Sequence, residues 1–519
     1  MADTYYVTTP IYYVNDVPHI GHAYTTIAAD VLARFWRAAG RDVRFLTGTD
    51  EHGIKIVKAA AEKRLTPQHL ADDVVVHFQR LWRDLNISND DFIRTSSARH
   101  ERRVQALVSR LVERDEIYLG SYEGWYDEGQ EEFVTESAAR DNEYRSAISG
   151  RALVRYSEPS YFFRLGKWVP RLIEHIRAEP SCVQPEARRN EVLSKLQQGV
   201  EDLSISRQRE KLANWGVPMP NDPAHSVYVW IDALSNYYTA LGLPEIGDEH
   251  DGRHARYWPA DVHLIGKDIL WFHAVYWPCM LMALDLPLPR CVFAHGWWTS
   301  EGKKMSKTLG NFISREQIAE ICGEYSVDVF RWFLLRAVAF GADGDFSRAA
   351  LQGRYNTDLA NGVGNLFSRT TNMIGRYFEG ALPAGGGQVA EAGELRAAAE
   401  ALAGGAPGWM AACQFHGYLD AVESLVTATN RFIEVTEPFK LAKDPGQRGR
   451  LGDILYTCGE AVRLVLVYLR PIMPATADAG LRQLGWSAEG RPLAEAGRWG
   501  VLPAGTAVVK GEMLFPRKV

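Results

Sequence analysis

Residues 5–40 have the pattern of a strand, a tight turn and a helix, and this pattern restricts the fold more than any other feature of the chain. Residues 5–9 are β-branched and aromatic, as in a buried strand, and a turn containing Pro, Asn and Asp follows. Residues 21–39 have helical periodicity, and Gly40 ends the helix. A strand that enters a helix through a tight turn forms the corner where doubly wound α/β folds bind nucleotides. The pattern therefore predicts a Rossmann-type sheet.

The turn into this helix carries the motif Pro-His-Ile-Gly-His at residues 18–22. His19 and His22 are three residues apart and project from one side of the helix start, so both imidazoles can donate hydrogen bonds to phosphate oxygens. Gly21 leaves room for a nucleotide to approach the backbone. In isolation such a pair more often represents two surface histidines at a helix N-terminus, so the assignment depends on a second motif.

A lysine-rich loop bracketed by glycines, residues 302–311, supplies the second motif. It contains Lys304 and Lys307, which would balance the charge that builds as pyrophosphate leaves a triphosphate. Such a loop can close over its substrate. On its own it would be an ordinary exposed loop. The order of the two motifs and the distance between them favour an enzyme that adenylates a carboxylic acid with ATP.

The composition limits the remaining possibilities. With 519 residues, of which 46% are hydrophobic, the chain can bury large cores and is expected to hold several domains. Its net charge of -6 argues against a general affinity for nucleic acid, although a large RNA that touches one face would tolerate it. The six cysteines are scattered without CxxC spacing, which predicts reduced thiols and a cytoplasmic protein. We find neither a secretory leader nor an apolar span of membrane length, so no membrane association is expected.

The first half of the chain is expected to form a split Rossmann domain. Residues 42–47 resemble a second strand, which leads into acidic and imidazole groups at residues 48–53, and ligands bind at such strand ends. Short alternating runs at residues 118–163 indicate a small β-containing insertion. The sheet is then expected to resume at residues 226–230 and 261–266.

From residue 314 the pattern is helical almost to the end, which predicts an α-helical bundle. Strong helical stretches occupy residues 356–378, 415–435 and 449–469. The residues after 486 are expected to pack back on the body as an arm. The predicted parts are a first Rossmann half (1–115), a connective insertion with return helices (116–225), a second Rossmann half (226–290), a region with the lysine loop (291–350), the bundle (351–480) and the C-terminal arm (481–519).

Six segments carry a resemblance to a known family: TTPIYYVNDVPHIGHAYT, FLTGTDEHG, SYFFRL, VYVWIDAL, HLIGKDILWFHAVYWPCML and GKKMSKTLGN. They are similar to segments of the methionyl-tRNA synthetases, and the similarity extends over nearly the full chain. All class I synthetases have relatives of the first and last segments, whereas the middle four separate the methionine enzymes from those for leucine, isoleucine, valine and cysteine. The resemblance implies a Rossmann-type α/β catalytic domain with a β-containing insertion, followed by an α-helical bundle.

The resemblance implies a pocket for L-methionine. Methionine is flexible and carries a polarizable thioether, so its pocket needs aromatic and aliphatic walls with one polar contact near the sulfur. Tyr13 and His273 are expected to offer that hydrogen bond, and Asp50 to accept from the substrate ammonium. Taken singly, Ala233 and Leu234 would be ordinary core residues. The wall residues of the family correspond here to Ile11, Tyr13, Trp230, Ala233, Leu234, Tyr237, Ile269 and His273.

The resemblance also implies a site for ATP with Mg²⁺. In the family the neighbourhood of Gly266 and Asp268 contacts the adenosine, and Asp268 is suited to accept hydrogen bonds from ribose hydroxyls. The methionine carboxylate would attack the α-phosphate to give methionyl-adenylate, and a hydroxyl at the 3′ end of tRNA would then attack the acyl carbon. No side-chain nucleophile is needed, so positioning and charge compensation carry the catalysis. The predicted catalytic residues are His19, His22, Lys304 and Lys307, which bind ATP together with Gly21, Gly266 and Asp268.

The resemblance assigns the bundle to the anticodon of tRNA(Met), initiator and elongator alike, and residues 291–350 to stem contacts. In the family an Asn and an Arg four residues apart meet the unstacked bases together with an aromatic residue that follows a proline. The matches here are Asn365, Arg369 and Phe439. An aromatic ring suits a single-stranded base, since each stacked contact contributes about 1–3 kcal/mol. Many relatives have Trp where this chain has Phe439, which has no indole N–H, and a role in the core is the alternative for this residue.

The chain departs from the family in two places. Many relatives bind zinc through CxxC pairs in the insertion, but residues 122–130 contain no cysteine, and structural zinc normally needs four ligands, mostly thiolate or imidazole. An insertion without zinc is therefore expected. Some relatives also append an OB-fold that binds tRNA and joins two chains. None follows the bundle here, so a monomer is expected.

Three alternatives to this interpretation make different predictions. Another class I synthetase is the nearest, and amino-acid-dependent pyrophosphate exchange would separate it. A different small-molecule adenylyltransferase would have no use for the helical half. A non-catalytic RNA-binding relative would be expected to have a damaged histidine or lysine motif, but both motifs are intact.

Overall fold

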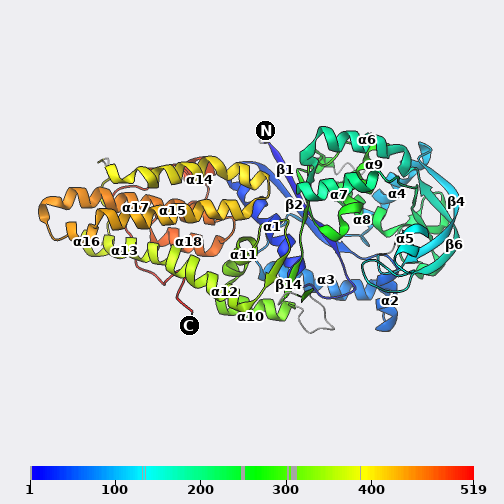
Figure 1. Ribbon diagram of the computed structural model, residues 1–519, viewed down its shortest axis with the longest axis horizontal. Helices are drawn as coiled ribbons and strands as arrows, with labels where there is room; N and C mark the ends of the chain where they lie inside the picture. Colours follow the sequence, from blue (N-terminus) through cyan, green and yellow to red (C-terminus); the bar gives the residue numbers. More distant parts are fainter. Residues whose placement is uncertain are drawn as a thin grey trace. The chain divides into compact units, whose positions relative to one another are not determined.

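The computed structural model divides into two compact units (Figure 1). The sheet unit contains residues 3–29 and 43–295, and the helical unit contains residues 30–42 and 296–519. Helix α1 (Ile20–Ala38) contributes to both units, because the division falls between Ala29 and Asp30. The structure describes residues 3–130, 132–134, 136–246, 252–300, 303–304, 313–385, 387 and 389–518.

The sheet unit is built on a six-stranded sheet with the order β3-β2-β1-β12-β13-β7. Its neighbours β1 and β12, β12 and β13, β13 and β7, and β2 and β3 all pair in parallel. The strand order reverses between β1 and β12, and ligands of open α/β sheets bind outside the carboxyl ends of the strands at such a point. The predicted Rossmann-type fold is confirmed. The strands are β1 (Thr4–Tyr13), β2 (Asp42–Asp50), β3 (Asp91–Arg94), β7 (Val183–Gln184), β12 (Val262–Gly266) and β13 (Val292–His295).

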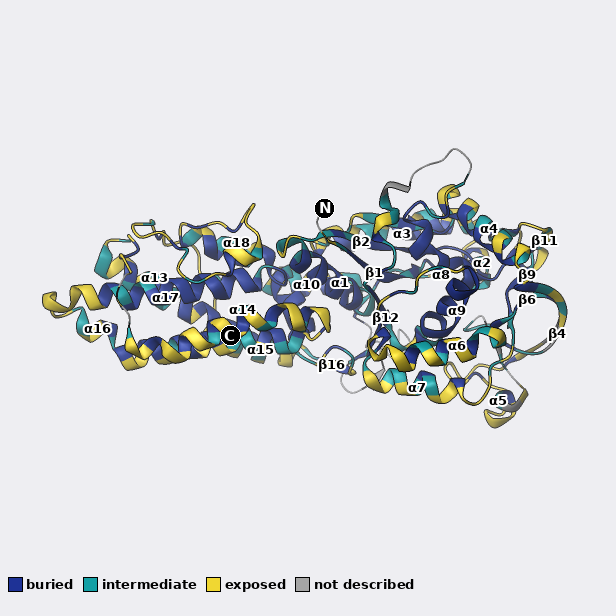
Figure 2. Ribbon diagram, turned by 90° about the horizontal axis from the view of Figure 1, so that it is seen from above, coloured by how far each residue is buried: buried dark blue, intermediate teal, exposed yellow. Residues whose placement is uncertain are grey.

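Helices connect and cover these strands. Helix α1 follows β1 as predicted and ends just before Gly40, whose φ of 89° is a conformation that glycine adopts without strain. Figure 2 shows α8 and α9 buried along their whole length, whereas α6 and α7 carry exposed residues. The other helices of this unit are α2 (Ile54–Glu62), α3 (Pro67–Asp84), α4 (Ala98–Glu113), α5 (Glu136–Asp141), α6 (Leu165–Ala178), α7 (Glu186–Leu196), α8 (Val229–Thr239) and α9 (Trp277–Ala283).

The predicted β-containing insertion is a separate four-stranded sheet with the order β5-β4-β6-β8. Its long strands β4 and β6 pair antiparallel from Ile117 opposite Phe163 to Tyr126 opposite Val154. A three-stranded sheet, β10-β11-β9, follows it. The strands are β4 (Ile117–Asp127), β5 (Glu132–Val134), β6 (Val154–Phe163), β8 (Leu203–Ser204), β9 (Ser206–Gln208), β10 (Pro218–Met219) and β11 (Asp222–Val227).

The prediction that the main sheet resumes at residues 226–230 is wrong. Ser226 and Val227 end β11, which belongs to the three-stranded sheet, and helix α8 begins at Val229. Every residue of α8 is buried. A helix that is buried on all sides has no polar stripe, so its first turn looks like the apolar run of a buried strand.

The helical unit is mainly α-helical, as predicted, and α14, α15 and α17 lie side by side in it (Figure 1). A small sheet, β15-β14-β16, takes two strands from before α10 and one from after α11, and a π-helical segment (Tyr355–Gly364) runs into α13. Among the described residues no helix is long and apolar enough to cross a membrane. The elements are β14 (Trp298–Ser300), β15 (Lys303–Lys304), α10 (Arg315–Tyr325), α11 (Val327–Arg336), β16 (Gly344–Phe346), α12 (Arg348–Arg354), α13 (Asn365–Phe378), α14 (Gly393–Ala411), α15 (Phe415–Thr436), α16 (Pro438–Leu441), α17 (Arg448–Leu469), α18 (Pro474–Gln483) and α19 (Leu493–Ala496).

Candidate active site

The turn between β1 and α1 brings the two imidazoles of the histidine motif together. The ring centroids of His19 and His22 lie 3.9 Å apart. The backbone N–H of Gly21 donates to Nδ1 of His19 at 3.0 Å, and the backbone N–H of His19 donates to Nδ1 of His22 at 3.1 Å. Backbone N–H groups at a helix start have no acceptor within the helix, and here the two side chains provide it.

These hydrogen bonds determine which ring nitrogen carries the proton. Because Nδ1 accepts in both rings, each neutral imidazole has its proton on Nε2, and Nε2 is the donor to any ligand. Burial lowers the pKa of His19 to about 4, although the Asp268 carboxylate acts in the opposite direction. Burial, and then the neighbouring His19, lower the pKa of His22 well below its usual value. Both imidazoles are therefore neutral donors at pH 7.

Gly21 has a steric reason to lack a side chain. A Cβ atom on Gly21 would lie 2.9 Å from Cε1 and 3.1 Å from Nδ1 of the His19 ring. The sequence suggested that this glycine makes room for a nucleotide. The geometry adds that any side chain here would push His19 away from its backbone donor.

The carboxyl ends of β12 and β13 contribute the next group of residues. Gly266 ends β12 and is opposite His295 of β13 in the parallel register. A Cβ atom on Gly266 would lie 2.6 Å from Oδ1 of Asp268, so the glycine leaves space for that carboxylate. Nε2 of His295 lies 2.6 Å from Oγ1 of Thr25 on α1. Sequence reasoning missed His295, although its place at the end of a β-branched and aromatic run was an available signal.

The predicted methionine-pocket residues come from β1, α8 and the segment after β12. Trp230, Leu234 and Tyr237 belong to the core of the sheet unit, whereas Ile11, Tyr13 and Ile269 pack against that core and are partly exposed. Ala233 is buried as well. The Trp230 ring stacks on Phe272 with centroids 3.8 Å apart and meets Tyr13 and His273 edge-on, each at 6.4 Å. An apolar pocket is expected to have this arrangement, in which buried side chains form the floor and partly exposed side chains form the rim.

A chain of hydrogen bonds fixes the polar groups of this cluster. Nδ1 of His273 donates to the carbonyl oxygen of Ile269 at 3.0 Å, because a carbonyl can only accept. Burial lowers the pKa of His273 to about 4, so its Nε2 is unprotonated and accepts from the Tyr237 hydroxyl at 2.7 Å. Both nitrogens of His273 are engaged, so in this arrangement its ring has no N–H to offer to the substrate sulfur.

Asp50 is the last residue of β2 and is 2% exposed. Its carbonyl oxygen accepts from the backbone N–H of Val14 at 3.3 Å, which ties the end of β2 to the end of β1. The next residue, Glu51, is also buried and is held by Arg94, whose Nε and Nη2 donate to the two carboxylate oxygens at 2.7 and 3.0 Å. The acidic and imidazole cluster predicted at residues 48–53 therefore lies at a strand end, where the sequence placed it.

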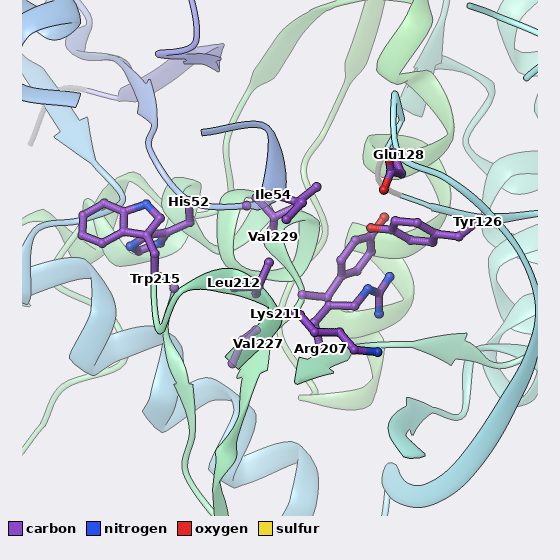
Figure 3. A pocket seen from close by; sticks show the side chains of 13 residues that line it. His52, Ile54, Tyr126, Glu128, Arg207, Lys211, Leu212, Trp215, Val227 and Val229 are labelled. Carbon is purple, nitrogen blue, oxygen red and sulfur yellow. The ribbon is translucent and has the colours of Figure 1, made fainter. Parts of the chain in front are cut away.

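A pocket opens beside this strand end, between the end of β2 and the insertion (Figure 3). Its lining includes His52, Tyr126, Arg207 and Trp215. The guanidinium of Arg207 lies over the Tyr228 ring at 4.5 Å and over the Tyr126 ring at 5.3 Å. Sequence reasoning missed this pocket, because its residues are spread over segments far apart in the chain and share no motif.

Three comparisons with known proteins bear on this geometry. The family model described as class I tRNA synthetases (M) matches residues 5–143 and 139–371. The methionine–tRNA ligase of Caldanaerobacter subterraneus subsp. tengcongensis is 47% identical over 100% of this chain and 79% of its own length. That of Rickettsia felis is 43% identical over 100% of this chain and 99% of its own length. The solved structure of Mycobacterium tuberculosis methionyl-tRNA synthetase in complex with methionyl-adenylate matches with a TM-score of 0.92 and 40% identity, covering 99% of this chain and 100% of that chain.

The chain belongs to the class I methionyl-tRNA synthetases. The identity is well above the level at which only the fold is shared, and the match covers both units of the structure. The resemblance inferred from the six sequence segments is thereby confirmed.

The lysine motif of this synthetase falls largely outside the described residues. Lys304 ends β15, which pairs antiparallel with β14, so that Thr299 is opposite Lys304. The side chain of Lys304 and the whole of Lys307 are not among the described residues. Their assignment to ATP stays a prediction.

The anticodon residues predicted for this synthetase lie in the helical unit. Asn365 and Arg369 are one turn apart on α13, and Nη1 of Arg369 donates to Oδ1 of Asn430 on α15 at 3.2 Å. Phe439 lies on the short helix α16 and is 46% exposed, which favours an accessible ring over a core residue. Sequence reasoning missed Asn430, which carries no motif of its own.

Within the described ranges, no group of three or more His, Cys, Asp or Glu side chains is arranged to hold a metal ion. All six cysteines are free thiols. The expectation of an insertion without zinc stays a prediction for direct metal analysis.

Proposed function

We propose that the protein is a methionine–tRNA ligase, which activates L-methionine with ATP and transfers it to the 3′ end of tRNA(Met). One observation carries the proposal: the segment directly after β12 carries both Asp268, whose Oδ1 lies beside Gly266 at the strand end, and Ile269, whose carbonyl oxygen accepts from His273 of the apolar pocket at 3.0 Å. A nucleotide at the β1–β12 switch point and an amino acid in the pocket would therefore have their reacting groups side by side. The M. tuberculosis relative, which was solved in complex with methionyl-adenylate, supports this assignment.

In the first step ATP, as its magnesium complex, is a substrate, and the methionine carboxylate attacks its α-phosphate. His19 and His22 would donate from Nε2 to phosphate oxygens, since their Nδ1 atoms already accept from the backbone. Because both imidazoles are neutral before ATP binds, they add hydrogen bonds without adding charge. Gly21 and Gly266 would allow close approach of the nucleotide, and Asp268 would accept from the ribose. Lys304 and Lys307 would balance the charge on the departing pyrophosphate.

For methionine, we assign the ammonium to Asp50 and the side chain to Ile11, Tyr13, Trp230, Ala233, Leu234, Tyr237, Ile269 and His273. The aromatic faces among these residues suit a polarizable thioether. The second step needs no protein nucleophile, because a ribose hydroxyl of the tRNA attacks the activated acyl carbon directly.

We propose that the protein works as a monomer. Sedimentation of the purified protein tests the monomer. Free thiols at all six cysteines are typical of a reducing compartment, and we assign the protein to the cytoplasm.

Methionine-dependent exchange of pyrophosphate into ATP, followed by charging of tRNA with a CAU anticodon, tests the proposed function. Exchange with methionine and with no other of the twenty amino acids is expected. Exchange that depends on a different amino acid would replace the substrate, and failure to charge tRNA would leave only an adenylating enzyme.

We assign the anticodon to Asn365, Arg369 and Phe439. Asn365→Ala and Arg369→Ala should each lower charging of tRNA(Met) by about fivefold or more, since a lost base contact of about 1–3 kcal/mol has this effect. Pyrophosphate exchange without tRNA should stay within about twofold, because the two substitutions leave the sheet unit unchanged. Full discrimination of CAU by both variants would contradict the assignment.

A further inference from the structure

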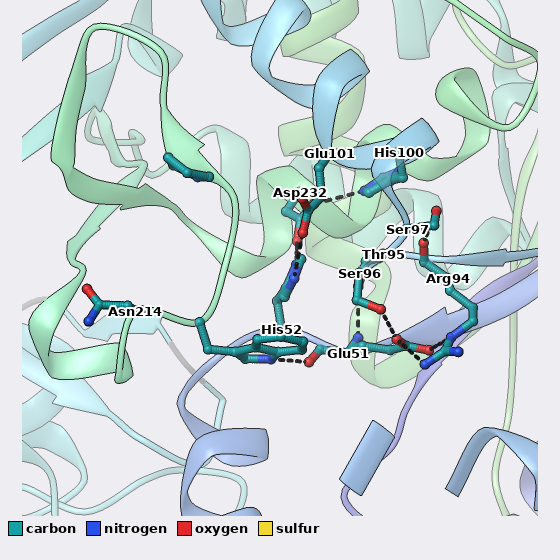
Figure 4. A network of polar contacts seen from close by, with 12 residues as sticks. Glu51, His52, Arg94, Thr95, Ser96, Ser97, His100, Glu101, Asn214 and Asp232 are labelled. Atoms are coloured by element: carbon teal, nitrogen blue, oxygen red, sulfur yellow. Dashed lines mark hydrogen bonds and ion pairs between the residues drawn. The ribbon is translucent and has the colours of Figure 1, made fainter. Parts of the chain in front are cut away.

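A buried carboxylate on helix α8 is held by imidazoles from two other segments (Figure 4). Asp232 is 1% exposed; its Oδ2 lies 2.7 Å from Nδ1 of His52, and its Oδ1 lies 2.8 Å from Nε2 of His100. An ionised carboxylate only accepts, so both rings donate to it. Nδ1 of His100 also lies 2.7 Å from Oγ1 of Thr239, the last residue of the same helix. We call Asp232, His52 and His100 the Asp232 clasp.

The clasp contains a buried pair of opposite charges. Burial alone would lower the pKa of His52, but the Asp232 carboxylate, helped by Glu101, raises it to about 10. Burial alone would raise the pKa of Asp232, but His52 and His100 lower it to about 2. At pH 7 an imidazolium therefore faces a carboxylate. Such a pair tolerates little displacement, since separating the partners would leave each as an uncompensated buried charge.

Helix α8 presents the clasp and the methionine-pocket residues on opposite faces. Trp230, Leu234 and Tyr237 follow the spacing of one helix face. Asp232 and Thr239 are seven residues apart and follow the spacing of the face turned away from them. The clasp can therefore hold α8 by the face opposite the methionine-pocket residues, without occupying the pocket.

The other end of the clasp is attached to the strand that carries the ammonium acceptor. His52 comes two residues after Asp50, beyond the end of β2. The Trp215 indole covers this segment: its Nε1 donates to the Glu51 carbonyl oxygen at 2.6 Å, and its ring meets His52 edge-on at 5.1 Å. These contacts hold the segment between Asp50 and His52 in place. The ion pair between His52 and Asp232 then fixes the position of α8 relative to this segment.

We propose that the Asp232 clasp is a positioning device for methionine binding, which sets the distance between Asp50 and the pocket wall on α8. This inference depends on the proposed function. Asp232, His52 and His100 are positioning residues, because none of them is among the residues assigned to methionine or ATP. A carboxylate that binds the ammonium and a wall that binds the side chain can act on one molecule only if their separation matches its length.

The substitution Asp232→Asn tests the proposal, because it removes the charge with almost no change in volume. KM for methionine in pyrophosphate exchange should rise by about tenfold or more, while KM for ATP and kcat stay within about threefold. Glu116→Gln is the matched control. Glu116 is another buried carboxylate of the sheet unit, which accepts from Trp168 Nε1 on α6 at 2.9 Å. This control should leave KM for methionine within about twofold even if it lowers the melting temperature.

A spectroscopic measurement gives a readout that general loss of stability does not produce. In the wild-type protein the nitrogen-15 signals of the His52 ring, identified by their loss in His52→Gln, should remain those of an imidazolium above about pH 8. In Asp232→Asn they should titrate much closer to the free-histidine value of about 6.5. Besides Asp232, the groups facing the ring are Glu101 and the Trp215 indole, and neither changes in this variant.

Equal rises in KM for methionine in Asp232→Asn and Glu116→Gln, or a rise in KM for ATP as large as that for methionine, would overturn the positioning role. A His52 ring that titrates alike in wild type and Asp232→Asn would overturn the ion pair. Wild-type protein measured in parallel separates the two levels of inference. If it shows no methionine-dependent exchange, the proposed function fails; if it exchanges normally and Asp232→Asn does the same, only the clasp fails.

Discussion

At the scale of single residues, the turn between β1 and α1 keeps the His19 ring in place only because residue 21 is a glycine and has no side chain. The substitution Gly21→Ala would place Cβ 2.9 Å from the His19 ring, which can relieve the contact only by turning away from its backbone donor. Adenylate formation should then slow by about tenfold or more, because one oriented donor to the transition state is typically worth at least this much. Methionine binding, followed by tryptophan fluorescence, should be unchanged. The rate is measured by pyrophosphate exchange.

Gly323 is the matched control for that substitution. It lies on the exposed side of α10, and nothing lies within 4 Å of a Cβ atom placed there. Gly323→Ala should keep full activity and stabilise the helix by about 0.5–1 kcal/mol. A Gly21→Ala enzyme with the wild-type exchange rate would show that His19 does not need the position described above.

The sequence predicted the positions of some site residues better than the hydrogen bonds of others. His19, Gly21 and His22 form a motif, and the motif was enough to place them at a helix start. The expected hydrogen bond from His273 to the substrate sulfur was not compatible with its surroundings, since its two nitrogens are engaged by Ile269 and Tyr237. Those partners depend on how α8 packs against the segment after β12, and the identity of the residue does not reveal this packing.

At the scale of elements, periodicity predicted amphipathic helices well and fully buried ones poorly. Helix α15, with its buried residues at helical spacing, begins at Phe415 as predicted. The first two residues of helix α8, which is buried all round, were taken for the end of a strand, although the helix carries four assigned pocket residues. The edge strand β7 has only two residues and is too short for any alternating pattern. What the sequence could not supply was the environment of each element, which decides whether an apolar run is a strand or a helix.

The attachment of the C-terminal arm is an element-scale feature with a measurable consequence. Glu460 and Arg463 on α17 are fully buried and 2.7 Å apart. Glu460 also accepts from the backbone N–H groups of Gly500 and Leu502, while Arg463 donates to the carbonyl oxygens of Ala496 and Arg498. Glu460→Gln leaves the guanidinium without its counter-charge, so the free energy of unfolding should fall by about 3–5 kcal/mol.

Urea unfolding measures this loss, and limited proteolysis should cut the arm of the Glu460→Gln protein sooner than that of the wild type. The control is Glu495→Gln. Glu495 pairs with Arg491 in solvent, with side chains 47% and 46% exposed, and its substitution should cost less than about 1 kcal/mol. Equal losses of unfolding free energy in the two variants would mean that the buried Glu460–Arg463 pair stabilises the fold no more than the exposed Glu495–Arg491 pair does.

At the scale of the whole molecule, buried neutral imidazoles make the fold sensitive to acid. Burial lowers the pKa values of His19 and His273 to about 4, and those of His22 and His263 well below the ordinary value. Their pKa returns to about 6.5 in the unfolded chain, which therefore binds more protons than the folded chain as the pH falls from 6.5 towards 4. The free energy of unfolding should decrease over this range. His52 does not contribute to this decrease, because its raised pKa keeps it protonated in both states below about pH 6.

Urea unfolding followed by tryptophan fluorescence at about pH 7.5 and at several values down to about pH 5 measures this dependence. Each imidazole that stays neutral in the folded protein contributes up to about 1.4 kcal/mol per pH unit. His273→Gln should therefore reduce the slope by about one such contribution, even if it lowers stability at every pH. A slope that this variant leaves unchanged would mean that His273 is already protonated in the folded protein. Its Nε2 would then be a donor, and the Tyr237 hydroxyl would have to accept from it, which reverses the polarity of the hydrogen bond in the methionine pocket.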